Sequence, residues 1–380
     1  MITLTMMKQT LRSAGLSLLF IGVIVSYSFC STEGWKLFTA GGEGVYGLNN
    51  PVFVYKGYLY CSHFSGYYRV KLNSDGRFSE MTSLRTGLGM GLQQSSVASN
   101  GECFYFTGGK TENDIPNLNS FVVYYVKIDS KGFLSSPIQT YDLRNHRAFH
   151  SSLVVNNRLY VLGGYSHNEH IPQFALKSVE YADIDTTTGG IKGPFKYTHS
   201  FSTISGKVYV AFNRGNRIFC LGERSTAPNQ PSIGCWMEYA DIQTDGSLGM
   251  WTALPGPYSL TPDLACLTDK STLFIIGPSS GSRGHPSMRM ALSSDRDNVS
   301  VKLRAETTSL IGRKGPSTIA WDRFVYLLGG DKASYEVYAS DNSGSGLFSD
   351  MNTSYYSVSE SIQIPDDLME ELEGQNDESQ

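Results

Sequence analysis

Charged residues are scarce in this sequence, and no basic segment stands out. Only 17% of the 380 residues are charged, and the formal net charge is −4. Seven acidic residues lie in the last 15 positions, and the cations Lys8 and Arg12 lie near the start, which leaves the rest of the chain close to neutral. A nucleic-acid-binding surface needs clustered Lys and Arg, so the composition excludes that class of partner.

Cysteine is also scarce: there are six residues and no Cys-x-x-Cys pair of the kind found in redox and zinc sites. Cys220 ends one predicted strand and Cys235 begins its partner, so we expect a disulfide across the intervening loop, worth about 3 kcal/mol. Cys61, Cys103 and Cys266 fall inside strand patterns, which predicts buried thiols.

No set of residues has the spacing of a metal or cofactor site. His167 and His170 flank Asn-Glu in a polar segment, but two histidines and a glutamate on one loop lack the other ligands of a zinc site. Residues 42–47 have the glycine spacing of a dinucleotide site, yet Asn-Asn-Pro follows where a helix should begin. We therefore predict neither a metal nor a cofactor.

The amino terminus has the parts of a secretory signal peptide. Lys8 and Arg12 precede an uncharged run over 14–25, and small residues follow it. We predict a signal peptide over 1–28, with an uncleaved membrane anchor as the alternative, because the run is barely long enough to span a bilayer. The rest of the chain is then secreted, extracellular or periplasmic, or displayed outside the membrane. Two glycosylation sequons agree with that location if the host is eukaryotic: Asn298 and Asn352.

Glycine and tyrosine, by contrast, are abundant, with 39 and 23 residues. This composition favours turns and strands over long helices. One stretch shows the pattern fully: an apolar run over 151–155, a turn at 156–157, an alternating strand over 158–162, a third strand over 178–184 and a fourth around 191–195. It predicts a four-stranded antiparallel meander.

The same pattern recurs along the chain. Copies of the third strand are separated by 57, 56, 58, 51 and 48 residues. The aligned residues are Tyr68, Tyr125, Tyr181, Tyr239, Met290 and Tyr338. A fixed period of this length is typical of repeat folds, in which each unit packs on its neighbours. We predict six repeats; a sandwich of unrelated hairpins is the alternative.

The second strand ends on a double glycine in three copies, at 108–109, 163–164 and 329–330. Four apolar residues, a double glycine, a later tyrosine and an aromatic after the next turn resemble the kelch repeat. The resemblance covers about 34–356 and implies an all-β fold, a six-bladed kelch-like β-propeller with four antiparallel strands per blade. Its Glu-Tyr-Ala-Asp-Ile segments are most similar to extracellular bacterial and sialic-acid-mutarotase-like kelch proteins. Galactose oxidase carries such a propeller, but its copper motif has no match here.

Two segments compete to supply the outer strand of the last blade. Residues 35–40 precede the first repeat, and residues 347–350 follow the last third strand. Pairing the first of these with the last blade would close the ring and leave no open edge. The residues after the last repeat are polar and acidic, which predicts a disordered tail over 357–380.

In a propeller, the loops that enter each inner strand share a face with those between second and third strands. The longest polar loops fall on that face, and such loops commonly carry binding sites. His146, Arg147 and His150 directly precede an inner strand, so their side chains could reach the mouth of the central channel. The other candidate binding residues of this face are Arg144, His167, His170, Arg283, His285 and Arg313.

The leader, the rigid scaffold and the lack of a catalytic set favour a secreted or surface-displayed module. We expect it to bind an extracellular protein or glycan through the long-loop face. The alternative is a carbohydrate-active enzyme such as a sialic-acid mutarotase or epimerase, because proton transfer at a sugar needs only one or two acid–base groups. A structural role in a surface coat is a third hypothesis. No catalytic residue is assigned.

Overall fold

The computed structural model describes residues 35–39, 51–63, 66–74, 78–85, 94–109, 120–168, 171–225, 234–254, 264–267, 272–276, 286–292, 301–307, 317–321, 324–328 and 337–341. All the regular structure in these ranges is β-strand, and no helix long and apolar enough to cross a membrane occurs in them. The predicted signal peptide over 1–28, the sequons at Asn298 and Asn352, and the predicted tail over 357–380 lie outside the described residues.

The strands are β1 (Trp35–Thr39), β2 (Phe53–Tyr55), β3 (Tyr58–His63), β4 (Gly66–Leu72), β5 (Phe78–Arg85), β6 (Ser96–Ser99), β7 (Cys103–Thr107), β8 (Val123–Lys127), β9 (Ile138–Gln139), β10 (Ser151–Val155), β11 (Arg158–Leu162), β12 (Tyr165–Asn168), β13 (Ile171–Ala175), β14 (Val179–Asp183), β15 (Lys196–Thr198), β16 (Val208–Arg214), β17 (Arg217–Glu223), β18 (Cys235–Asp241), β19 (Thr252–Ala253), β20 (Leu264–Leu267), β21 (Thr272–Ile276), β22 (Pro286–Leu292), β23 (Val301–Thr307), β24 (Ser317–Trp321), β25 (Phe324–Leu328) and β26 (Val337–Asp341).

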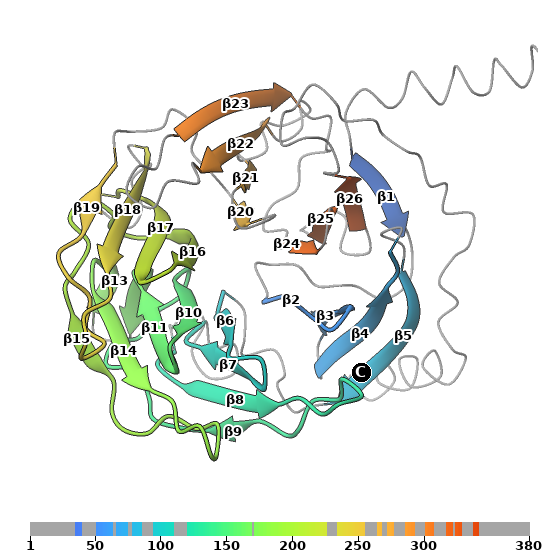
Figure 1. Cartoon of the computed structure of the whole chain (residues 1–380), viewed down its shortest axis with the longest axis horizontal. Helices are drawn as coiled ribbons and strands as arrows, with labels where there is room; N and C mark the ends of the chain where they lie inside the picture. The colour runs from blue at the N-terminus through green and yellow to red at the C-terminus, as the bar shows by residue number, and fades with distance from the viewer. Residues whose placement is uncertain are drawn as a thin grey trace, which may run out of the picture.

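Among the described residues these strands form six four-stranded antiparallel sheets and one separate two-stranded sheet, β12-β13. In chain order their strands are β2-β3-β4-β5, β6-β7-β8-β9, β10-β11-β14-β15, β16-β17-β18-β19, β20-β21-β22-β23 and β24-β25-β26-β1, called the first to sixth sheets below. Figure 1 shows them arranged around a common centre, with the first strand of each sheet innermost. The predicted all-β fold with four antiparallel strands per unit is confirmed.

The third sheet shows how local sequence sets the strands. The turn between β10 and β11 places Asn156 and Asn157 at φ 50° and 56°, so Val155 and Arg158 pair directly. Asparagine tolerates this left-handed conformation better than most residues, and the predicted hairpin is confirmed. The fourth strand differs from the prediction. It is β15, later in the sequence, and Ile191 only bridges Ile184.

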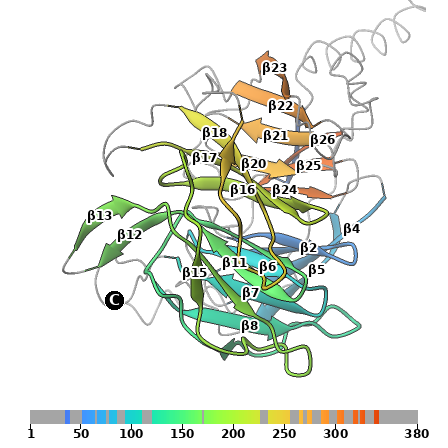
Figure 2. The ribbon, with the colours of Figure 1, turned by 60° about the vertical axis from the view of Figure 1, so that its left-hand side comes forward.

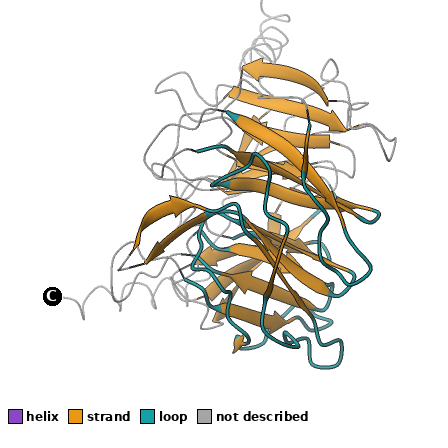
Figure 3. Cartoon of the chain, turned by 90° about the vertical axis from the view of Figure 1, so that its left-hand side faces the viewer, coloured by secondary structure: helices purple, strands orange, loops and turns teal. Residues whose placement is uncertain are grey.

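The segment after β11 was expected to be an irregular polar loop. It instead contains the hairpin of β12 and β13, in which Tyr165 pairs with Ala175. Figures 2 and 3 show this hairpin standing out from the ring. Its base is held by Ala148, whose N–H and C=O both bond to Tyr165 at 3.0 and 2.8 Å.

The two ends of the described chain meet in the sixth sheet. β1 pairs with β26 in antiparallel register, with Trp35 opposite Ser340 and Leu37 opposite Tyr338. The early segment is therefore the outer strand of the last sheet, and the competing segment at 347–350 lies outside the described residues. This pairing covers an edge of β26 that would otherwise be open to other chains.

Neighbouring sheets are joined by apolar packing and by a repeated hydrogen bond. The hydroxyl of a second-strand tyrosine donates to a turn-glycine carbonyl of the next sheet. The three pairs are Tyr60 to Gly132 at 2.7 Å, Tyr105 to Gly189 at 2.8 Å and Tyr160 to Gly246 at 2.8 Å. Each of these glycines has a φ between 82° and 86°, the left-handed conformation that glycine adopts without strain. These turn glycines therefore link one sheet to the next.

Candidate functional site

Arg147, expected at the channel mouth, lies in the interior with no exposed surface. Its Nη2 pairs with Oε1 of Glu180 at 2.5 Å, and its Nη1 donates to Gly163 O at 2.8 Å. Glu180 stands on β14, where a charged residue in an otherwise apolar strand needs partners. Burial lowers the pKa of Arg147, and the carboxylate of Glu180 opposes that shift. The arginine therefore fixes the segment before β10 to the third sheet.

Glu238 holds the segment that enters the fourth sheet, and it does so through backbone N–H groups. Its carboxylate accepts the backbone N–H groups of Ser202 at 2.8 Å, Thr203 at 2.6 Å and Ile204. Charge-assisted bonds of this type satisfy a buried carboxylate well. The glutamate of the Glu-Tyr-Ala-Asp repeat is thus an anchor for the linker that enters the same sheet, and sequence reasoning missed this role.

His150, which directly precedes β10, is also buried, with 5% of its surface exposed. Its Nε2 shares a hydrogen bond of 2.8 Å with Thr107 Oγ1 on β7, whereas Nδ1 has no partner among the described residues. Burial and the positive charge of Arg147 lower the pKa of His150 well below 6.5. The side chain is therefore a neutral contact between the second and third sheets.

A buried carboxylate, Glu223, lies between the third and fourth sheets on the long-loop side. It accepts hydrogen bonds from the hydroxyls of Tyr165 and Tyr209, the latter at 3.1 Å, and from the backbone of Lys207 at 3.1 Å. Burial and the bond to Glu223 raise the pKa of the Tyr165 hydroxyl. Lys207 Nζ lies 4.9 Å from the centre of the Tyr209 ring. This cluster was not predicted, because its members are distant in sequence.

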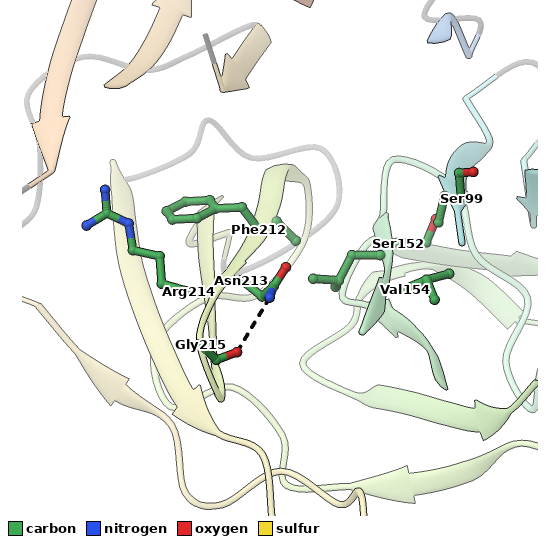
Figure 4. Close-up of a pocket in the computed structure, with 10 residues that line it drawn as sticks. Ser99, Ser152, Val154, Phe212, Asn213, Arg214 and Gly215 are labelled. Atoms are coloured by element: carbon green, nitrogen blue, oxygen red, sulfur yellow. Dashed lines mark hydrogen bonds between the residues drawn. The ribbon is translucent and has the colours of Figure 1, made fainter. Parts of the chain in front are cut away.

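A cavity of about 710 Å³ lies among the inner strands of the second, third and fourth sheets. Figure 4 shows its lining residues, and the pocket reaches the short turn after β16. The polar lining residues are Ser99, Ser152, Asn213 and Arg214, and the apolar ones include Val154 and Phe212. The cavity size is typical of small-molecule sites. The cavity extends toward the face with the short turns, such as the turn after β16. The sequence analysis instead placed the candidate binding residues on the long-loop face.

Comparison with known proteins gives a consistent picture of the fold. A Kelch motif matches residues 146–186, which include β10, β11 and β14. The solved structure of YjhT is 15% identical with a TM-score of 0.53, covering 80% of this chain and 95% of that chain. A cryo-EM structure of RAG in complex with one melted and one unmelted RSS is 15% identical, with a TM-score of 0.55. The match covers 81% of this chain and 99% of that chain.

The fold is a kelch-type β-propeller. The sheets are accordingly its blades, and the space between the inner strands is its central channel. At this low identity the likeness to solved structures concerns the fold alone. The sequence matches none of the curated proteins.

The remaining candidate binding residues differ in exposure and in the element that carries them. Arg144 is exposed, and its guanidinium carbon lies 5.0 Å from the centre of the Tyr197 ring. His146 is half-buried, with its ring 4.5 Å from that of Phe121. His167 lies on β12 of the projecting hairpin. The other candidates lie outside the described residues: His170, Arg283, His285 and Arg313.

The expected disulfide between Cys220 and Cys235 is not present. In the ladder of β17 and β18, Cys220 pairs with Glu238, and Cys235 pairs with Glu223. The two thiols are thus three ladder positions apart, roughly 10 Å along the strand and on opposite faces of the sheet. A disulfide needs Cα atoms within about 7 Å. Burial instead raises the pKa of Cys235 to about 12.

Within the part of the chain that the structure describes, no three His, Cys, Asp or Glu side chains gather closely enough to hold a metal ion.

Proposed function

We propose that this propeller is an extracellular or surface-displayed binding module that takes a small glycan in its central cavity. The observation that carries the proposal is the cavity between the inner strands of three consecutive blades. A site built on the innermost strands of a rigid ring is held in place by the whole scaffold. Blades of this kind host many functions, so the cavity and not the fold is the basis of the proposal.

The lining suits a neutral or weakly acidic saccharide. Asn213 and Arg214, which carry amide and guanidinium donors, line the cavity together with Ser99 and Ser152. The Ser152 hydroxyl bonds to Ser96 Oγ at 2.8 Å, and such a chain of hydroxyls can both donate and accept. Val154 offers apolar contact for the carbon face of a sugar ring.

A cavity-filling substitution tests the proposal. In Ala211→Trp the indole should occupy the cavity and reduce the affinity for a glycan by more than about tenfold, as measured by calorimetry after an array screen. Ala253→Trp, on the exposed outer strand β19, is the matched control and should leave affinity unchanged. Glycan binding that survives Ala211→Trp would place the site elsewhere, for example on the long-loop face.

A second candidate function, a sugar mutarotase or epimerase, is favoured by the cluster around Glu223. A carboxylate hydrogen-bonded to two tyrosine hydroxyls can move protons at a sugar hydroxyl. An NMR anomer-exchange assay on free sialic acid separates the two functions. The enzyme requires accelerated exchange that Glu223→Gln abolishes, whereas the binding module requires affinity without acceleration.

A further inference from the structure

A patch of exposed aromatic and cationic side chains lies on the outer part of the second and third blades. Its residues, called the rim patch, are Phe121, Tyr141, Arg144, His146 and Tyr197. Phe121, Tyr141 and Tyr197 are 37%, 51% and 50% exposed, high values for large aromatic rings. Rings exposed together on a soluble protein commonly mark a contact surface.

The residues of the rim patch come from backbone segments that lie side by side. The backbone over 140–143 runs beside β8, because Thr140 N bonds to Val123 O at 3.0 Å and Leu143 N bonds to Phe121 O at 2.8 Å. Tyr141 lies between these two bonds, and the ring of Phe121 lies 4.5 Å from that of His146. Arg144 continues the surface onto Tyr197 of the outer strand β15.

The positive charge of Arg144 has a carbonyl and an aromatic ring as neighbours. Its Nη1 donates to Phe195 O at 3.3 Å, and its guanidinium lies over the Tyr197 ring, so its position is fixed. The carboxylate of Glu180, which accepts the backbone N–H of Arg144 at 2.6 Å, is buried and already pairs with Arg147. No ion pair joins Arg144 to a carboxylate within the described ranges. A positioned guanidinium of this type suits an incoming carboxylate.

The sequence itself contains a segment of matching chemistry. Residues 365–374 read Pro-Asp-Asp-Leu-Met-Glu-Glu-Leu-Glu-Gly, with five carboxylates, three large apolar side chains and no cation. Asp366 is 25 residues beyond the end of β26, a length that reaches up to about 80 Å when extended. That reach covers the rim patch from the sixth blade.

We propose that the acidic segment 365–374 binds the rim patch of the same chain. Carboxylates of the segment pair with Arg144, and its leucines and methionine cover Tyr141 and Tyr197. Exposed ion pairs are individually weak, so affinity comes from several pairs together with buried apolar surface. We expect a dissociation constant of roughly 100 μM for the separate segment, and a tether supplying about 1 mM effective concentration keeps the patch occupied in the intact chain.

A labelled synthetic peptide of residues 365–374 tests this by fluorescence anisotropy on the full chain. In the wild-type chain the tethered segment 365–374 competes with the added peptide for the rim patch. The peptide should therefore bind the wild-type chain about tenfold more weakly than a neutral-tail chain. The neutral-tail chain carries Asp366→Asn, Asp367→Asn, Glu370→Gln, Glu371→Gln and Glu373→Gln. High salt should weaken the binding.

Two further variants of the neutral-tail chain assign the contact. Arg144→Glu should reduce peptide affinity about tenfold, whereas Lys127→Glu, an exposed lysine on β8, should have little effect. Thermal melts confirm that each variant is folded. Absence of peptide binding to the neutral-tail chain, or equal loss in both variants, overturns the proposal. A wild-type dimer that dissociates on tail neutralisation also overturns it, because the segment then occupies a second copy.

Discussion

Two opposite charges meet without access to water at Arg147 and Glu180, whose side chains have no exposed surface. Removing one partner of such a pair leaves the other charge buried and uncompensated, which is far more costly than the pair itself is stabilising. The pair also joins the linker before β10 to β14, so its loss affects the packing of a whole blade.

Arg147→Met should therefore lower the free energy of unfolding by roughly 3–5 kcal/mol, measured by urea denaturation. The matched control is Arg158→Met, which breaks the more exposed pair with Asp183 at 2.7 Å. That change should cost less than about 1 kcal/mol. Equal losses in the two variants would contradict the interior role of Arg147.

His150 gives the fold a dependence on pH. Its pKa in the folded chain is well below the ordinary 6.5, so the unfolded chain binds the extra proton first as pH falls. The stabilisation is complete above about pH 6.5 and decreases below it, by at most about 1.4 kcal/mol per pH unit for one proton.

Urea midpoints measured between pH 7.5 and pH 5 should fall steadily in the wild type and less steeply in His150→Gln. Glutamine can bond to Thr107 but takes up no proton, so it isolates the titration from the contact. Parallel pH profiles for the two proteins would assign the acid sensitivity to other groups.

Sequence position alone could not separate His146 from Arg147 and His150. All three precede β10, yet His146 is half-buried against Phe121 while the other two are buried. Which way each side chain points depends on backbone contacts with neighbouring blades, which no local pattern encodes. A useful signal did exist: the glutamates at 180 and 238 are charged residues inside apolar strands and require buried partners.

At the scale of elements, the double glycine has a steric cause. Gly163 has a φ of 64°, and a Cβ there would lie 2.6 Å from Val208 Cγ2, the first residue of β16. Gly164 is similar, with a Cβ 2.6 Å from Ala148 O. The two positions after β11 therefore have no room for a side chain, because the residues that lead into β10 and begin β16 pass against them.

Gly163→Ala should lower the free energy of unfolding by about 2–4 kcal/mol, from left-handed strain together with the displacement of Val208. Gly193→Ala is the control, because its φ is not in the left-handed region and a Cβ there meets nothing within 4 Å. Urea denaturation of the two variants measures the difference. A near-neutral Gly163→Ala would refute the steric explanation.

The sequence predicted β10, β11 and β14 nearly to the residue, since alternation, turn chemistry and the double glycine agree there. It failed at β12 and β13, because a polar segment with a proline gives no strand signal and its pairing depends on an anchor at Ala148. It also failed for Cys220 and Cys235, because proximity across a loop does not fix ladder register.

For the whole molecule, the sequence period predicted the radial sheets, and the sheets of the described residues agree with it. The strand that completes the last blade was not predictable, because both candidates were short and pairing between distant ends has no local signature. The cavity could not be predicted from the sequence either, because it depends on the spacing of the inner strands of three blades.

Closure of the ring by β1 is the claim on which the arrangement of blades depends, and a cross-link tests it directly. Leu37 and Tyr338 are register partners, and opposed Cα atoms in such a ladder lie about 4.5–5.5 Å apart, within disulfide range. Oxidised Leu37→Cys/Tyr338→Cys should contain this internal disulfide by non-reducing peptide mapping. Leu37→Cys/Thr252→Cys, which reaches to β19 of the fourth blade, should not link. A chain that forms no disulfide at the first pair, or forms it equally at the second, would contradict a propeller closed by its first strand.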